Sequence, residues 1–189
     1  MSEIMTVTHG IAPVWNAESR ILILGTMPSP KSREAGFFYM HPQNRFWKIM
    51  PALFGEQFSV GNGSPDKEKA IAERREFLLR HKIALWDVLK ECEISGASDS
   101  SIKNAVPNDF SEIFGNAKIE RVFCTGKTSF ALWKKHCARY ETRYKVGSAC
   151  LPSTSPANAR FTESALVEAY REILGFVEGE MNLFESGGF

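Results

Sequence analysis

Short, mostly apolar segments that alternate with helical patterns constrain the fold of this chain most strongly. Residues 20–25 read RILILG, residues 83–88 read IALWDV, residues 119–125 read IERVFCT, and a fourth such segment covers residues 144–151. Runs of this length and composition are typical of strands buried on both faces, which occur mainly in parallel sheets covered by helices. The sequence therefore predicts an α/β fold with three layers (αβα) around a central, mostly parallel four-stranded sheet.

Helical patterns lie between and after these strands, over residues 45–54, 67–82, 107–115, 126–139 and 162–177. The first helix is expected to bend or stop near Pro51, because proline lacks the amide hydrogen that a helix interior uses. Ser64, followed by Pro65, predicts the cap of the second helix. Residues 93–104 are mostly polar and are expected to form an ordered loop.

Length and composition favour a single globular domain. The chain has 189 residues, of which 43% are hydrophobic and 24% charged, ordinary values for one compact unit. We expect the domain to cover residues 1–189, with its core at about 20–178 and a frayed tail at 179–189. No apolar run approaches the roughly 20 residues of a membrane helix, and no secretory signal pattern opens the chain. A cytoplasmic monomer is therefore expected.

The cysteines and histidines show no spacing typical of a metal site. The sequence contains no Cys-x-x-Cys pair, and no two histidines stand at the separation of paired ligands. Buried thiols are the simpler interpretation of the cysteines. We therefore expect neither a metal nor a cofactor. The residues concerned are Cys92, Cys124, Cys137, Cys150, His9, His41, His81 and His136.

Positive charge gathers in one part of the chain, although the formal net charge is only +1. Between Lys118 and Lys145, eight lysines and arginines stand against two glutamates. Such a segment forms either a basic face that binds phosphate groups or a solvated helix face without a partner. The charge by itself does not decide between the two.

Two loops that follow predicted strands carry the most specific patterns. Residues 25–47 read GTMPSPKSREAGFFYMHPQNRFW, and residues 151–160 read LPSTSPANAR. The first loop resembles motif 1 of the uracil-DNA glycosylase superfamily, in which Gly-x-x-Pro follows a strand and an aromatic residue precedes Asn-Arg-Phe-Trp. The second is similar to motif 2, a serine-containing loop before the last helix. In both loops the chain most resembles the hypoxanthine-DNA (DNA-deoxyinosine) glycosylase branch, and the resemblance extends over roughly residues 20–177.

This resemblance implies a monofunctional DNA-repair glycosylase whose partner is DNA. Its reaction would be hydrolysis of the N-glycosidic bond of a deaminated base, hypoxanthine before uracil. The base must first flip out of the stack, since C1′ cannot be reached inside a duplex. Water then attacks C1′ while the base departs as an anion, which calls for hydrogen-bond donors around the leaving group. Lys31 is the only lysine in the two loops, so Schiff-base lyase chemistry has little support.

The resemblance points to Asn44 as the catalytic polar group, because an amide accepts from water and donates to an oxygen without ionising. The same residue is also a suitable helix cap. The chain departs from the pattern twice. Met27 replaces the Asn of mismatch-specific relatives, and Ser153 stands where some families carry a histidine that supports the departing base. Ser153 is therefore the second catalytic candidate, and Met27 is expected in the base pocket.

Tyr39 aligns with the aromatic residue that stacks on the flipped base, a contact worth about 1–3 kcal/mol. At least one of Phe37, Phe38 and Tyr39 is expected to lie in the core instead. His41 either faces the base pocket or shapes the turn before Pro42.

Asp87 ends the second predicted strand, where several sister families carry an Asn that contacts the base edge. An ionised carboxylate only accepts hydrogen bonds. It would accept from N1–H of hypoxanthine and leave O6 to a backbone N–H, whereas adenine and cytosine present different edges. A cap after the strand is an equally good interpretation.

Five residues are expected to contact DNA phosphates: Ser29, Lys127, Ser155, Asn158 and Arg160. Gly126-Lys127-Thr128 is not a P-loop, because the preceding glycine is missing and Arg121 stands in its place. It resembles instead a phosphate-contact loop of the superfamily. Ala157 stands where sister enzymes carry a large wedge residue, so another side chain must fill the gap or the wedge is weak.

Two further functions are compatible with the sequence. The first is a module that binds damaged or mismatched DNA without cutting it, which the replacement of both usual catalytic residues favours. The second is an α/β domain that acts on free nucleosides. Steep weakening of binding with salt would distinguish DNA from a nucleoside.

Overall fold

The computed structural model describes residues 4–95 and 101–178. Its central sheet contains β2 (Ile21–Gly25), β3 (Ile83–Asp87), β6 (Arg121–Thr125) and β7 (Gly147–Leu151) in the order β3-β2-β6-β7. Every neighbouring pair in this sheet is parallel. The predicted four-stranded parallel sheet is therefore confirmed.

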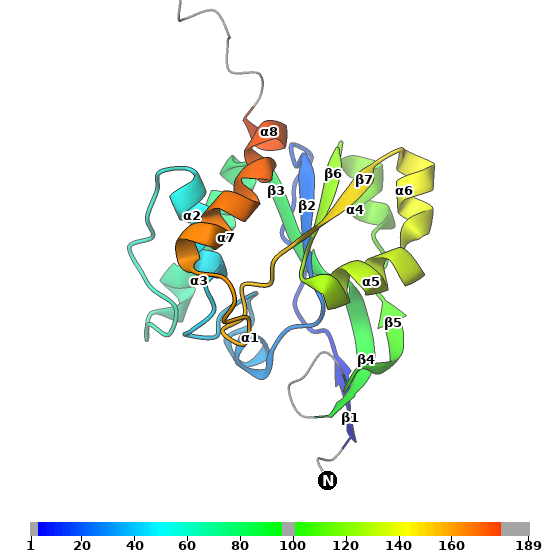
Figure 1. Ribbon diagram of the computed structural model, residues 1–189, viewed down its shortest axis with the longest axis horizontal. Coiled ribbons are helices and arrows are strands. Elements are labelled where there is room, and N and C mark those ends of the chain that lie inside the picture. Colours follow the sequence, from blue (N-terminus) through cyan, green and yellow to red (C-terminus); the bar gives the residue numbers. More distant parts are fainter. Residues whose placement is uncertain (1–3, 96–100, 179–189) are drawn as a thin grey trace, which may run out of the picture.

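Helices cover both faces of the sheet (Figure 1), which completes the predicted three layers. One face carries α2 (Phe46–Leu53), α3 (Lys67–Arg80) and α7 (Glu163–Tyr170). The other carries α4 (Ser111–Asn116), α5 (Lys127–His136) and α6 (Ala138–Tyr144).

The alternation of side chains along β2 explains why both faces must be covered. Ile21 and Ile23 pack into the hydrophobic cluster on the side of α2 and α7, whereas Leu22 and Leu24 pack into the cluster on the side of α5. All four side chains are fully buried. A strand that is apolar on both faces can satisfy both only in the middle of a three-layer fold.

A second sheet, not predicted from the sequence, lies beside the carboxyl end of the first. It contains β1 (Ile4–Thr8), β4 (Leu89–Ser95) and β5 (Lys103–Pro107) in the antiparallel order β1-β4-β5. The predicted polar loop at residues 93–104 is wrong where the structure describes it, because both of its ends belong to strands. Cys92 and Ile94 are buried between partly exposed neighbours, so a half-exposed strand was hidden by its polar face.

Several predicted boundaries also differ from the structure. The cap of α3 is Asp66, whose carboxylate accepts from the Lys69 amide at 3.1 Å, and not Ser64. The expected stop near Pro51 is confirmed, because α2 ends at Leu53, two residues later. An additional helix, α1 (Pro30–Ala35), interrupts the first motif loop.

The later helices are more broken than expected. Residues 126–139 belong to α5 and α6, which are separated at Cys137. The last helical region divides into α7, a 3₁₀ turn over Arg171–Ile173, and α8 (Leu174–Val177). The tail predicted at 179–189 lies outside the described residues. Within the described ranges, no helix has both the length and the apolar character needed to cross a bilayer.

The topology brings the two motif loops together. Because β2, β3, β6 and β7 are parallel, their carboxyl ends share one edge of the sheet, toward which α1 and the loop after β7 both turn (Figure 1). Ligands of open parallel sheets bind at this edge.

The corrected cap of α3 gives a direct test of the local structure. Asp66→Ala should lower the free energy of unfolding by about 1 kcal/mol, because the amide of Lys69 loses its partner. Ser64→Ala, two residues earlier, should lower it by clearly less. Urea denaturation measures both, and equal losses would contradict the assignment of Asp66 as the cap.

Candidate active site

A cavity of about 510 Å³ lies at the carboxyl ends of β2, β3 and β6. Its size suits a small organic ligand. Eight predicted site residues from both motif loops and β3 line it: Met27, Ser29, Tyr39, Asn44, Asp87, Ser153, Ser155 and Asn158. The fold thus gathers residues that are up to 131 positions apart in the sequence.

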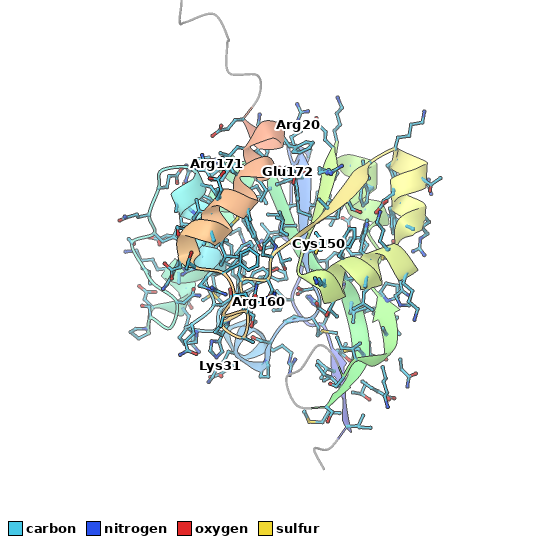
Figure 2. The ribbon with its side chains drawn as sticks, viewed as in Figure 1. Arg20, Lys31, Cys150, Arg160, Arg171 and Glu172 are labelled. Atoms are coloured by element: carbon cyan, nitrogen blue, oxygen red, sulfur yellow. The ribbon has the colours of Figure 1, made fainter. Side chains whose placement is uncertain are left out.

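Three other predicted site residues are absent from this lining. His41 lies beside the cavity, where its Nδ1 accepts from the Gln43 amide at 3.2 Å, an arrangement that shapes the turn. Lys127 begins α5 and is exposed. Arg160 is exposed in the loop after β7, at the same end of the molecule as Lys31 (Figure 2).

Hydrogen bonds to its side-chain oxygen fix the orientation of the Asn44 amide. Its Oδ1 accepts from the Phe46 amide at 2.9 Å and from the Thr154 hydroxyl at 2.9 Å. An amide oxygen has two lone pairs, so both are used. No described residue is bonded to Nδ2, which leaves the NH₂ group as the part of Asn44 that can serve a ligand. Asn44 closes the turn before α2, whose N-cap position is Arg45.

Arg45 joins the two motif loops. Its side chain donates to four backbone carbonyls, with Nε to Thr154 at 3.4 Å and Nη2 to Ser155 at 2.8 Å and to Asn158 at 2.9 Å. Its Nη1 donates to the carbonyl of Phe161, and its own backbone amide donates to Thr154 at 3.1 Å. A guanidinium presents five donors in a fixed plane, so one side chain sets the path of the whole second loop.

Tyr39 belongs to the first motif loop, and one face of its ring is occupied. Its ring stacks on Phe46 with centroids 4.0 Å apart, so only the opposite face is available to a ligand. Its hydroxyl is 2.8 Å from Oγ1 of Thr125. Burial and the Asp87 carboxylate raise the pKa of Tyr39 well above its usual value, so the hydroxyl stays neutral. Phe37 and Phe38, by contrast, are core residues, as predicted for at least one of the three aromatics.

The backbone at Tyr39 adopts a left-handed conformation with φ of 55°, which costs a non-glycine residue free energy. Asn62 holds it there by donating to the carbonyls of Tyr39 at 3.0 Å and His41 at 3.2 Å. Buried Arg74 in turn donates to Oδ1 of Asn62 at 2.9 Å. The position of the aromatic ring therefore depends on a buried arginine more than thirty residues away.

Asp87 is buried at the end of β3, with 3% of its surface exposed. Its carboxylate packs against Gly25 on β2, the register partner of Asp87, where a Cβ atom would collide with Oδ1 and with the Tyr39 hydroxyl. Glycine is needed at this position because the carboxylate occupies the space of a side chain. The second carboxylate oxygen is 2.9 Å from Nε2 of His9.

The second motif loop is braced from within. The Asn158 side-chain amide donates to the Ser153 carbonyl at 2.9 Å, and Oγ of Ser153 accepts from the Ser155 amide at 3.2 Å. Ser29 caps α1 by accepting from the Ser32 amide at 3.2 Å. These side chains line the cavity and stabilise their own loops at the same time.

Sequence reasoning missed Arg45, Thr154 and His9 as site residues. Arg45 stands inside the first motif, so its place next to Asn44 was a usable signal. His9 carried no such signal, because it reaches the site from β1 of the unpredicted second sheet. Across the described ranges, no three His, Cys, Asp or Glu side chains form a group that could hold a metal ion.

Removing the guanidinium tests the role of Arg45. Arg45→Met should lower the free energy of unfolding by about 2–4 kcal/mol, because several loop carbonyls lose a charged donor. Lys48→Met, on the same helix, removes only an exposed ion pair with Glu163 and should cost less than about 1 kcal/mol. Urea denaturation measures the free energy of unfolding of both variants. If Arg45→Met lost as little stability as Lys48→Met, the proposed coupling of the two loops by Arg45 would be contradicted.

Comparison with known proteins agrees with this geometry. Relatives named hypoxanthine DNA glycosylase occur in Methanosarcina barkeri, 35% identical over 122 residues (64% of this chain and 72% of the relative), and in Methanosarcina acetivorans, 29% identical over 160 residues (84% and 92%). A solution NMR structure from M. acetivorans, described as a candidate uracil DNA glycosylase, superposes with a TM-score of 0.68 at 27% identity, covering 89% of this chain and 99% of that one. The model of the uracil DNA glycosylase superfamily matches residues 12–174. The chain therefore belongs to the uracil DNA glycosylase superfamily.

Proposed function

We propose that this protein is a monofunctional DNA glycosylase that removes deaminated bases from DNA, hypoxanthine in preference to uracil. One observation carries the proposal: a single cavity at the carboxyl edge of the sheet gathers the Asn44 amide, the Asp87 carboxylate and the ring of Tyr39. The names of the Methanosarcina relatives support hypoxanthine as the base. A cytoplasmic monomer that needs no metal remains our working expectation.

In this proposal the flipped base stacks on the open face of Tyr39. The opposite face rests on Phe46, so the ring is a rigid platform. Asp87 accepts a hydrogen bond from N1–H of hypoxanthine, while a backbone N–H donates to O6. Met27 and His41 were both expected near the base; Met27 lines the cavity, and His41 acts through the turn that leads to Asn44.

The chemical step breaks the bond between C1′ and the base nitrogen and forms a bond from C1′ to the oxygen of water. The water proton passes to solvent, and the base leaves with the electron pair of the broken bond. Asn44 stabilises this departure through its NH₂ group, which holds the water oxygen or the departing base. Ser153 is the second candidate for this step, because its Oγ accepts from the Ser155 amide and its O–H can still donate to the departing base.

Phosphate contacts are proposed on both sides of the cavity mouth. Lys127 and Arg160 are exposed cations near it, and Ser29, Ser155 and Asn158 are polar groups in its lining. Some cations of the basic segment already have partners, since Lys134 pairs with Glu141 at 2.7 Å and Arg121 with Glu172 at 3.6 Å. Lys127 and Arg160 are therefore the better candidates.

A module that binds damaged DNA without cutting it is the second candidate function. The observation that favours it is that Met27 and Ser153 line the cavity in the places of the usual polar catalysts. Base release from oligonucleotides with one hypoxanthine, one uracil or no lesion separates the two functions. Release from hypoxanthine supports the glycosylase, whereas tighter binding to lesion DNA without release would replace it by the binding module.

Two substitutions at Asn44 separate its structural bonds from its chemistry. Asn44→Ala loses both bonds to Oδ1 and should reduce base release by about 10²–10³-fold, with a stability loss of about 1–2 kcal/mol. Asn44→Asp keeps the acceptor for Phe46 and Thr154 but replaces NH₂ by an oxygen. It should therefore fold normally and still lose most activity in single-turnover assays. Full activity of the Asn44→Asp variant would refute the donor role.

Salt dependence tests the phosphate contacts. Lys127→Ala and Arg160→Ala should each weaken binding to lesion and undamaged DNA alike and reduce the slope of log K against log salt by about 1. Lys82→Ala, before β3 at the opposite edge of the sheet, is the control. An unchanged slope in both test variants would place the phosphate contacts elsewhere on the surface.

A further inference from the structure

His9 forms a hydrogen-bond chain that ends at the cavity. Its Nε2 is 2.9 Å from Oδ2 of Asp87, and its Nδ1 accepts from the Ile11 amide at 3.2 Å. The two side chains are 1% and 5% exposed. This pair is therefore shielded from water, and its hydrogen bonds are strong in consequence.

The bond from the Ile11 amide indicates which tautomer the neutral imidazole of His9 adopts. A ring nitrogen that accepts from a backbone N–H carries a lone pair, so the hydrogen of the neutral ring stands on Nε2. Nε2–H then donates to Oδ2 of Asp87, which is the acceptor in this pair. The backbone at residue 11 thus determines, through one imidazole, that the carboxylate at the cavity is an acceptor.

The position of the imidazole is itself fixed by packing. His9 directly follows β1, and its backbone amide donates to the Lys90 carbonyl at 2.7 Å, which extends the pairing of β1 with β4. The rings of Phe38 and Trp86 lie against it, with centroids 6.0 and 6.2 Å away. The second sheet therefore positions the imidazole of His9, as a fixed hydrogen-bond donor, at the end of β3.

We propose that His9 is a positioning residue that determines which bases the enzyme accepts, an inference that rests on the proposed glycosylase function. By holding Oδ2, His9 leaves only Oδ1 of Asp87, on the side of Gly25 and Tyr39, for the base. A fixed acceptor favours a base with a hydrogen on its ring nitrogen over adenine and cytosine, which lack it. Deamination creates this hydrogen, because N1 of adenine and N3 of cytosine carry lone pairs, whereas N1 of hypoxanthine and N3 of uracil carry hydrogens.

This role makes a prediction about Asp87→Asn that a merely structural histidine does not. In the presence of His9, the donor on Nε2 would bind the amide oxygen of the new side chain and turn its NH₂ group toward the base. Hypoxanthine release should then fall by about 10²-fold or more, since N–H would face N–H. In the double variant His9→Leu/Asp87→Asn the amide is free to turn its oxygen to the base, so part of this loss should be recovered.

The experiment measures hypoxanthine release from single-stranded oligonucleotides under single-turnover conditions. His9→Leu should reduce kcat/KM by about 10–100-fold, as for other residues that orient a site group. His9→Gln, whose amide nitrogen reaches the place of Nε2, should recover most of this activity. His9→Asn, whose amide is too short, should not. His81→Leu, at the opposite end of β3, is the control and should leave activity unchanged.

The outcomes separate the inference from the function on which it rests. Recovery by His9→Gln together with a double variant more active than Asp87→Asn alone supports the proposal. Equal losses in His9→Gln and His9→Leu, or a double variant worse than either single one, would overturn it while the wild-type enzyme stays active. Absence of hypoxanthine release by the wild type would overturn the proposed function, and the base-selecting role of His9 with it.

Discussion

The contact between Arg45 and the backbone of the second motif loop is the interaction on which the site depends. The two loops leave different strands and are more than a hundred residues apart, and neither has enough regular structure to define its own path. One guanidinium satisfies carbonyls along the second loop from Thr154 to Phe161. In the other direction, the hydroxyl of Thr154 donates to the side-chain oxygen of Asn44. Arg45, next to the proposed catalytic residue Asn44, thus positions the second loop, which lines the cavity.

This coupling explains how an uncharged residue can have a defined catalytic orientation. An amide in a flexible loop could present either its oxygen or its nitrogen to a ligand. At Asn44 the oxygen has two partners, so the nitrogen is left for chemistry. Preorganised donors of this kind stabilise a departing anion without reorganising during the reaction.

On the other side of the cavity, a hydrogen-bond partner likewise fixes the orientation of the Asp87 carboxylate. Asp87 is buried beside Gly25 and a neutral Tyr39 hydroxyl, and His9 supplies the donor for its outer oxygen. Unpaired buried carboxylates are costly, so this one requires a partner close by. That partner directly follows β1, which means that the second sheet contributes to the candidate site as well as to the hydrophobic core.

The sequence by itself determined the central sheet, because strands such as Ile21–Gly25 are apolar on both faces and fit only between two layers of helices. It also determined the edge at which the cavity lies, and eight of the eleven site residues predicted from the sequence line it. Local patterns could not reveal the second sheet, because β1 and β4 pair residues more than eighty positions apart and the exposed side of β4 is polar. Tertiary structure alone decided which polar atoms have protein partners: whether Asn44 leaves its oxygen or its nitrogen free, and which oxygen of Asp87 is bonded, depends on Thr154 and His9, which only folding brings within hydrogen-bonding distance.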